Sequence, residues 1–411
     1  MAPYESDDTR GAEEVDDLHS VRRKAARYVV PVAVVGVAAA TIGLVPALAD
    51  SGDPDLPKIT AQQLIEKIAK SDVQQLSGTA KITTDLGLPN LGGLESGLIS
   101  GATKGGDGSS ADPSTKLPEL ASGTHTLRVA ADGPDRQKVS LIESAAEYSL
   151  IHNGKDVWGY DSKSNEVYHG TADQNGKKHR DEVPATPKDF ADQALKSVDD
   201  TTSVTVDGTA QVAGRDAYRL VIKPKHASGT TVGVISIAVD AKTGMPLKFT
   251  LTPASGGAAV VDAGFTQVSF AKPAASTFDF TPPKGAKVTE EKDAKARGRS
   301  GERGAPHKKF APQRGLTPQK GLAKEGTKVL GKGWNSIAVF DSGTKGGIPS
   351  SSGKGDLGGF LGSLGDHVSG KFGKGTVFST RLINALITDD GKVYVGTVTK
   401  DALVKAANAG Q

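Results

Sequence analysis

"NGKDVWGYDSKSNEVYH", residues 153–169, gathers three aromatic residues in a chain of 411 residues that is only 5% aromatic. Asn153-Gly154 is a strong signal for a two-residue turn, and the flanking residues alternate as in a half-buried β-hairpin. Trp158 and Tyr160 are two positions apart, so on a strand they face the same side. The segment therefore predicts a sheet in which two large rings point at one surface. That surface is either an ordinary core or a cavity for an apolar guest.

Alternating runs with turn signals recur along residues 50–283 and predict one α+β domain. Two sets of antiparallel strands are expected, in residues 124–169 and 202–270, each preceded by an amphipathic helix with a threonine cap. Residues 87–123 are rich in Gly, Ser and Pro. We expect this stretch to be a mobile insertion without regular packing.

The first residues of the chain indicate export. Residues 1–27 form a cytoplasmic tail, acidic at first and basic at its end, and residues 28–49 follow as 22 residues without a charge. The basic flank before this run orients the N-terminus inside. Ala-Leu-Ala at 47–49 resembles a signal-peptidase site, whereas the length of the run suits a transmembrane anchor. Both alternatives make the following residues extracytoplasmic, either secreted or anchored to the cytoplasmic membrane by residues 28–49.

The pattern changes again beyond residue 283. Residues 284–326 lack apolar periodicity, and residues 292–328 hold eleven Lys or Arg against three Asp or Glu. We expect a basic disordered linker, which is either a solvated spacer or a segment that lies on an anionic membrane surface. Residues 327–411 alternate once more, contain the hairpin turn Asp390-Gly391 and end in a helix. They predict a small α+β C-terminal domain.

The chain shows no pattern that is typical of an enzyme. It contains no Cys, and its eight His have no ligand spacing, so we expect neither a metal site nor a cofactor. "AKTG" at 241–244 and "SGTK" at 342–345 resemble two motifs of penicillin-interactive serine enzymes, but in reversed order and in different predicted domains. The net charge of +3 gives no case for nucleic acid as a partner. The sequence therefore predicts a non-catalytic protein.

Apolar residues at every second position of several predicted strands form the candidate binding surface. For any one of them, packing in an ordinary core is the alternative. Two helices offer little material to fill the inside of a strongly curved sheet, so we expect a cavity that takes an apolar guest. The predicted lipid-cavity residues are Leu127, Val129, Val139, Leu141, Trp158, Tyr160, Tyr218, Leu220, Ile222, Leu247, Phe249 and Leu251.

Four segments together resemble the LolA-like superfamily of bacterial periplasmic lipoprotein carriers. They are residues 153–169 and, in chain order, "AGRDAYRLVIKPK", "IAVDAKTGMPLKFTL" and "FDFTPPKGAKV". The resemblance implies an open, incomplete antiparallel β-barrel with a helical lid, which holds the acyl chains of a lipid or lipoprotein. It also implies that Trp158 and Tyr160 face inward and wall that cavity.

The end of the chain is similar to a second branch of that superfamily. Residues 391–407, "GKVYVGTVTKDALVKAA", resemble the end of the small C-terminal domain of RseB proteins, which bind anti-sigma factors. The Gly-rich stretch 343–375 departs from that pattern. The resemblance implies an alternative function, an envelope-stress regulator whose C-terminal domain binds a membrane-spanning anti-sigma partner.

Overall fold

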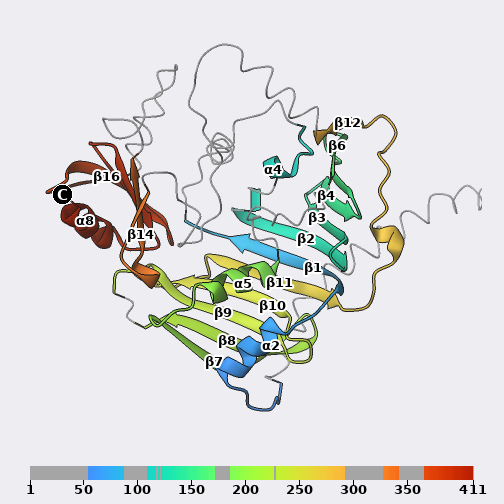
Figure 1. Ribbon diagram of the computed structural model, residues 1–411, viewed down its shortest axis with the longest axis horizontal. Helices are drawn as coiled ribbons and strands as arrows, with labels where there is room; N and C mark the ends of the chain where they lie inside the picture. Colours follow the sequence, from blue (N-terminus) through green and yellow to red (C-terminus); the bar gives the residue numbers. More distant parts are fainter. Residues whose placement is uncertain are drawn as a thin grey trace, which may run out of the picture. The chain divides into compact units, whose positions relative to one another are not determined.

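A computed structural model describes most of the chain after residue 53. The described residues are 54–87, 109–116, 119–120, 122–171, 186–225, 228–291, 327–341 and 365–410. They form one sheet of 12 strands and another of 6 strands, both within the compact unit Gly52–Gln411 (Figure 1). The predicted tail 1–27, the apolar segment 28–49 and the linker residues 292–326 lie outside the described residues.

Three of the four described α-helices begin where the capping residues Thr60, Thr186 and Thr399 predict, namely α2 (Ala61–Ala69), α5 (Pro187–Lys196) and α8 (Lys400–Ala409). The sequence does not predict the fourth, α4 (Pro113–Lys116). In α2, the Thr60 side chain accepts from the Gln63 amide, and the Gln63 side chain accepts from the Thr60 amide. Thr186 and Asp189 make the same reciprocal pair in α5. These boxes satisfy amides that the first helical turn leaves unpaired. Among the described residues, no helix combines the length and the apolar character needed to cross a membrane.

The large sheet consists of two antiparallel meanders joined through strand β1. Its strands are β1 (Gln75–Thr84), β2 (Gly123–Asp132), β3 (Arg136–Ile142), β4 (Glu147–Asn153), β5 (Asp156–Asp161), β6 (Glu166–Thr171), β7 (Thr202–Val212), β8 (Arg215–Pro224), β9 (Val232–Asp240), β10 (Pro246–Pro253), β11 (Val261–Ser269) and β12 (Lys287–Glu290). Their spatial order is β12-β6-β5-β4-β3-β2-β1-β11-β10-β9-β8-β7. We call β2–β6 the first half and β7–β11 the second half. The end strands β12 and β7 are not paired with each other, so the curled sheet is open.

Strand β12 extends the sheet beyond the predicted domain boundary at residue 283. It lies parallel to β6, with Lys287 opposite Glu166 and Glu290 opposite His169. A strand of four residues is too short to show a hydrophobic period, and its sequence lies in a run rich in charge. The first residues of the predicted linker therefore belong to the sheet.

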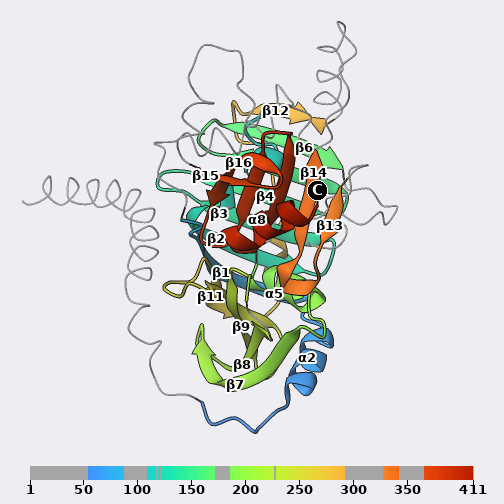
Figure 2. The same ribbon diagram turned by 90° about the vertical axis from the view of Figure 1, so that its left-hand side faces the viewer.

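The small sheet contains β13 (Lys328–Leu330), β14 (Ile337–Asp341), β15 (Asp366–Gly370), β16 (Gly373–Ser379), β17 (Asn384–Thr388) and β18 (Lys392–Gly396). It is drawn in orange and red in Figure 2. Helix α8 packs on it through Leu403 and Ala407, which share a core cluster with Tyr394. The predicted turn at Asp390-Gly391 joins β17 and β18, and Gly391 has the positive φ that such a turn requires.

Side-chain and backbone contacts connect the small sheet to the large one. The Trp334 indole N–H donates to Thr202 Oγ1 at 2.9 Å, and Arg381 pairs with the Asp85 carboxylate at 2.6 Å. Thr230 also forms an isolated antiparallel bridge with Val398. A small apolar cluster that includes Leu382 lies at the same junction. The predicted C-terminal domain is thus packed against the larger sheet.

Candidate functional site

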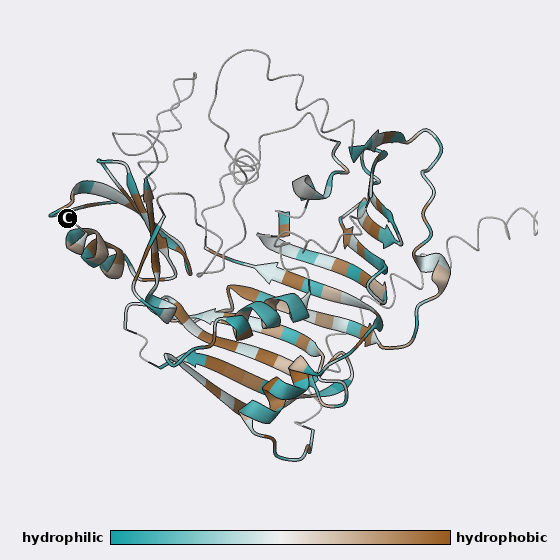
Figure 3. Cartoon of the chain, in the orientation of Figure 1, coloured by the Kyte–Doolittle hydropathy of each residue, from teal (hydrophilic) through white to brown (hydrophobic). Residues whose placement is uncertain are grey.

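We call the side of the large sheet that packs against α2 and α5 its inner face. In a sheet, residues that pair across strands point to the same side. One row of cross-strand pairs joins Leu141, Leu127 and Ala80. A second row starts two residues later on β1 and joins Ile82, Ala263, Phe249, Ile237 and Leu220. Every predicted lipid-cavity residue except Trp158 and Tyr160 therefore lies on this inner face. Figure 3 shows hydrophobic residues concentrated on strands β8–β10.

In the second half, two helices cover the inner face. Leu64 and Ile68 from α2 join Ala191 and Ala194 from α5 in one buried cluster, whose sheet residues are Tyr218, Leu220, Ile222, Ile235, Ile237, Val239 and Phe249. The Phe190 ring of α5 stacks on Phe249, with 5.2 Å between ring centroids. Each helix places its apolar stripe on the sheet at intervals of three and four residues, which is the spacing of one helical face. The helices and the second half thus form one continuous core.

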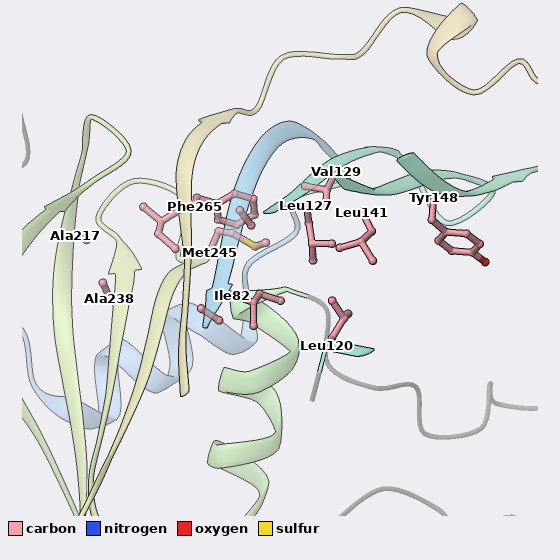
Figure 4. Packing of buried hydrophobic residues seen from close by; sticks show 13 residues of the cluster. Ile82, Leu120, Leu127, Val129, Leu141, Tyr148, Ala217, Ala238, Met245 and Phe265 are labelled. Atoms are coloured by element: carbon pink, nitrogen blue, oxygen red, sulfur yellow. The ribbon is translucent and has the colours of Figure 1, made fainter. Parts of the chain in front are cut away.

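In the first half, an irregular segment that includes the short helix α4 covers the inner face. We call residues 109–122 the strap; its described residues are 109–116, 119–120 and 122. Leu120 is only 5% exposed and packs in the cluster of Leu127 and Leu141, toward which it points in Figure 4. Ala111 is completely buried. This part of the predicted mobile insertion therefore packs on the sheet, contrary to the expectation from its composition.

One end of the strap is bound to Glu166 on β6. The hydroxyls of Ser109 and Ser110 and the amide of Ser110 all donate to Glu166 Oε2, at 3.0, 2.9 and 2.8 Å. Lys287 of β12 donates to Oε1 of the same carboxylate at 3.0 Å. The hydrogen bond from Lys287, followed by those from Ser110, lowers the pKa of Glu166 to about 2. Glu166 is therefore ionised at neutral pH and holds the strap and β12 together.

The other polar anchor of the strap is Lys116. Its ammonium lies 3.1 Å from Glu143, 3.6 Å from Glu119 and 3.7 Å from Asp161, and its side chain is only 14% exposed. Burial alone would lower the pKa of Lys116, but the hydrogen bond from Lys116 to Glu143 and the three negative charges outweigh it and raise the pKa. Lys116 is therefore charged, and the carboxylates of Glu143 and Asp161 hold its ammonium group over the large sheet.

The backbone of the strap approaches strand β5 closely at Gly159. The Tyr148 hydroxyl donates to the Ala111 carbonyl at 3.2 Å, and burial raises the pKa of Tyr148. A Cβ at position 159 would lie 2.2 Å from that same carbonyl oxygen. Glycine is the residue that lets another segment of backbone come this near to a strand. Gly159 thus provides the space in which the strap lies.

Trp158 and Tyr160 lie on the outer face of the sheet, opposite to the predicted cavity. Trp158 pairs with Ile151, and Tyr160 pairs with Ser149. The β3 residues that pair with Ile151 and Ser149 alternate with inner-face residues, so this whole set points outward. Both rings pack against Phe280, with centroid distances of 5.5 and 5.7 Å. Trp158 also stacks on the His169 imidazole at 3.8 Å. The expectation that these two rings line the same surface as the other predicted lipid-cavity residues is wrong. Alternation along a strand defines two faces but does not show which of them is the inner face.

The sequence interpretation missed the residues of the strap and its anchors. Pro113 opens the short helix α4, and Leu120 is an apolar residue within a Gly/Ser-rich stretch, but neither has a periodic partner that would predict packing. Among the residues that the structure describes, no group of three or more His, Asp or Glu side chains is arranged to hold a metal ion. The site is therefore built from apolar side chains, with charges at one edge.

Comparisons with known proteins yield structural matches only. No family model matches the chain, and no curated protein matches it either. Among solved structures, the chain is similar to MucB in the Pseudomonas aeruginosa MucA/MucB complex, with 14% identity, a TM-score of 0.37, and coverage of 84% of this chain and 96% of that chain. It is also similar to a LolA superfamily protein from Nitrosomonas europaea, with 11% identity, a TM-score of 0.22, and coverage of 54% and 99%. These likenesses are distant, and the function proposed below rests on contacts within this chain.

Proposed function

We propose that this chain is a non-catalytic, extracytoplasmic binding protein that holds the acyl chains of a lipid or lipoprotein against the inner face of the large sheet. Helices α2 and α5 serve as its lid. The observation that carries the proposal is the unbroken run of aliphatic and aromatic side chains from Leu141 on β3 to Leu220 on β8. A carrier of acyl chains needs apolar area of this kind.

An acyl chain suits such a face because its attraction is non-directional. Each methylene removed from water contributes about 0.8 kcal/mol, and a flexible chain can follow a curved sheet across several strands. Leu127, Leu141 and Phe249 are buried in the structure, beneath the strap and the helices. A guest on this face therefore replaces contacts that the chain makes with itself.

Lipid retention and probe binding test this function. Native mass spectrometry of the full chain after mild extraction should show a co-purifying lipid, and a fluorescent fatty acid should bind to the delipidated protein. Val139, half-buried on the inner face, and Lys138, its neighbour on the outer face, provide a matched pair. Val139→Asn should weaken probe binding about tenfold, the scale of one lost apolar contact, and Lys138→Asn should not. Equal effects of the two changes would contradict the assignment of the inner face.

A second candidate function is an RseB-like regulator that binds a membrane-spanning anti-sigma factor through the small sheet. Strand β13 is an edge of that sheet, and its Val329 side chain is 53% exposed. Exposed edge strands with apolar side chains can pair with an extended segment of another protein. Val329→Asp should abolish capture of the extracytoplasmic domain of such a factor and leave fatty-acid binding unchanged. Capture that survives this change would argue against β13 as the binding edge.

The proposal includes the predicted export and the predicted membrane contact. Residues 28–49 would direct the chain out of the cytoplasm or anchor it, and residues 292–328 would lie on anionic head groups. Co-sedimentation with vesicles should then increase with their anionic lipid content and decrease as salt rises. Replacing six of the eleven basic residues by Gln should remove most of this binding. Equal sedimentation with neutral and anionic vesicles would leave the linker as a spacer.

A further inference from the structure

The first half of the inner face is filled by the chain itself. Leu120 occupies the position beside Leu127 and Leu141, and Ala111 lies over Gly159 on β5. These positions are also where an acyl chain would contact β2–β5 if it bound along the inner face. The strap and the acyl chain cannot occupy this surface at the same time.

We propose that the strap is an internal competitor of the ligand: it occupies the acyl-chain position over β2–β5 and is displaced when an acyl chain binds. This inference rests on the function proposed above and adds where the ligand lies and what its binding must move. The helices α2 and α5 remain in place. The second half of the sheet then stays beneath its helical lid, and the first half is the exchangeable part of the site.

The contacts of the strap are suited to release. Its described apolar contacts come from Ala111 and Leu120, whereas α2 and α5 together insert Leu64, Ile68 and Phe190. Its other contacts are hydrogen bonds to Glu166 and ion pairs of Lys116. Groups of this kind regain hydrogen bonds to water when they separate, and this offsets part of the free energy that their contacts contribute. Withdrawal of the strap therefore exposes less apolar side-chain surface than withdrawal of the two helices together.

A strap that is docked most of the time sets the affinity of the site. The apparent dissociation constant equals the intrinsic constant divided by the fraction of molecules in which the face is free. If about one molecule in ten has a free face, fixing the strap in place removes the remaining binding, and weakening it strengthens binding up to about tenfold. These opposite effects on a single ligand distinguish a competitor from a structural part of the site.

A disulfide can fix the strap because two serine hydroxyls already meet at its end. Ser110 Oγ and Ser164 Oγ are 2.6 Å apart, and the chain has no native Cys. The doubly substituted chain Ser110→Cys/Ser164→Cys can therefore form one bond, of about 2.05 Å between sulfurs. Residue 122 leads directly into β2, so both ends of the strap are then held. The oxidised protein should bind a fluorescent fatty acid at least tenfold more weakly than the reduced protein, and reductant should restore binding.

Two controls accompany the disulfide. Ser110→Cys alone should bind the probe equally under oxidising and reducing conditions. Leu120→Ser, which removes an apolar contact of the strap, should strengthen binding severalfold. Equal affinity of the oxidised and reduced double variants, with wild-type binding intact, would overturn the strap inference and leave the proposed function standing. No binding by the wild type, the reduced double variant or Leu120→Ser would overturn the proposed function, and the strap inference with it.

Thiol labelling follows the movement without relying on affinity. Ala111 in the strap and Ala191 in α5 are both fully buried small residues, so Ala111→Cys and Ala191→Cys form a matched pair. Addition of oleate should accelerate labelling of the cysteine at 111 at least tenfold and leave labelling at 191 unchanged. Acceleration at 191 alone would show that α5 moves instead, and no acceleration at either position would exclude displacement of the strap.

Discussion

The two halves of the large sheet share one pattern of strands but differ in what covers their inner faces. Both are antiparallel meanders with apolar residues at alternate positions, and both pair with β1, directly or through their neighbours. The second half lies under two helices that are capped and apolar on one side. The first half lies under a strap that is held by Glu166, Asp161 and Glu143. The covering element, rather than the sheet, decides whether an apolar face is permanently closed.

The origin of this difference is visible in the charges at the edge of the first half. Tyr148 on β4 pairs with Asp161 on β5, and Asp161 pairs with Glu166 on β6, so both carboxylates point to the inner side. An amphipathic helix placed there would bury these charges without partners, which is costly. A segment with serine hydroxyls and one lysine satisfies them. The same carboxylates would select a ligand with a polar end at this edge of the site.

The largest expected effect is on the helix-covered half. Phe249→Ala removes the ring that stacks on Phe190 and should lower the free energy of unfolding by about 3–5 kcal/mol, the usual cost of emptying a buried aromatic site. Urea denaturation measures this loss. Thr250→Ala, at the next position of the same strand and on the other face, should change stability by less than about 1 kcal/mol. A loss below about 1 kcal/mol for Phe249→Ala would mean that the helices do not form a core with the sheet.

A smaller effect is expected when the strap is pushed off its strand. Gly159→Ala places a methyl group against the Ala111 carbonyl, so the strap must move, at a cost of about 1–3 kcal/mol. Hydrogen exchange should then accelerate in residues 109–116 and remain slow in β8–β10. In Gly170→Ala, the atoms nearest to the new methyl group belong to the side chains of Glu291 and Tyr168, and exchange in the strap should be unchanged. Loss of protection in β8–β10 as well would show that the two halves unfold together.

The sequence predicts the strands of both halves of the sheet, but it predicts the element that covers the inner face only for the second half. Thr60 and Thr186 carry capping signals, and the rows through Leu220 and Phe249 alternate over whole strands, so local rules determine these elements. The strap has no such signal because its packing depends on contacts between distant residues, such as Ser110 with Glu166. Composition predicts mobility there, and tertiary contacts override it in the described residues.

The error at Trp158 has a related cause. The spacing of Trp158 and Tyr160 correctly places both rings on one face of β5. The hairpin is also correct, but its two loop residues are Gly154 and Lys155, one position later than predicted, because Asn153 still pairs with Asp156. The choice of face depends on Phe280, which arrives from a segment more than a hundred residues later in the chain and covers the outer side. The alternation of residues within β5 does not predict this contact with Phe280. The face that Trp158 and Tyr160 occupy therefore could not be chosen from the spacing of residues within β5.

Acid should weaken the attachment of the strap through Glu166. Because the pKa of Glu166 is lowered from 4.5 to about 2 in the folded chain, its bonds contribute fully above pH 4.5 and are lost as pH falls toward 2. Glu166→Gln should therefore lower the free energy of unfolding by about 1–2 kcal/mol near neutral pH, and the difference from wild type should shrink between about pH 5 and pH 2.5. Urea denaturation at several pH values measures it. A difference that does not depend on pH would mean that the charge of Glu166 contributes nothing.

The smallest expected effect concerns Trp158, and it separates the outer face from the inner face. Trp158→Phe keeps an aromatic ring against Phe280 and His169, so the free energy of unfolding should fall by less than about 1.5 kcal/mol. Fatty-acid affinity of the folded protein should not change, because the ring lies on the side of the sheet opposite to Leu127 and Leu141. Val139→Asn, on the neighbouring strand β3 but on the inner face, should weaken the same affinity about tenfold. A loss of affinity in Trp158→Phe with unchanged stability would show that the ligand contacts the outer face, and the covering of the first half by the strap would then have no bearing on binding.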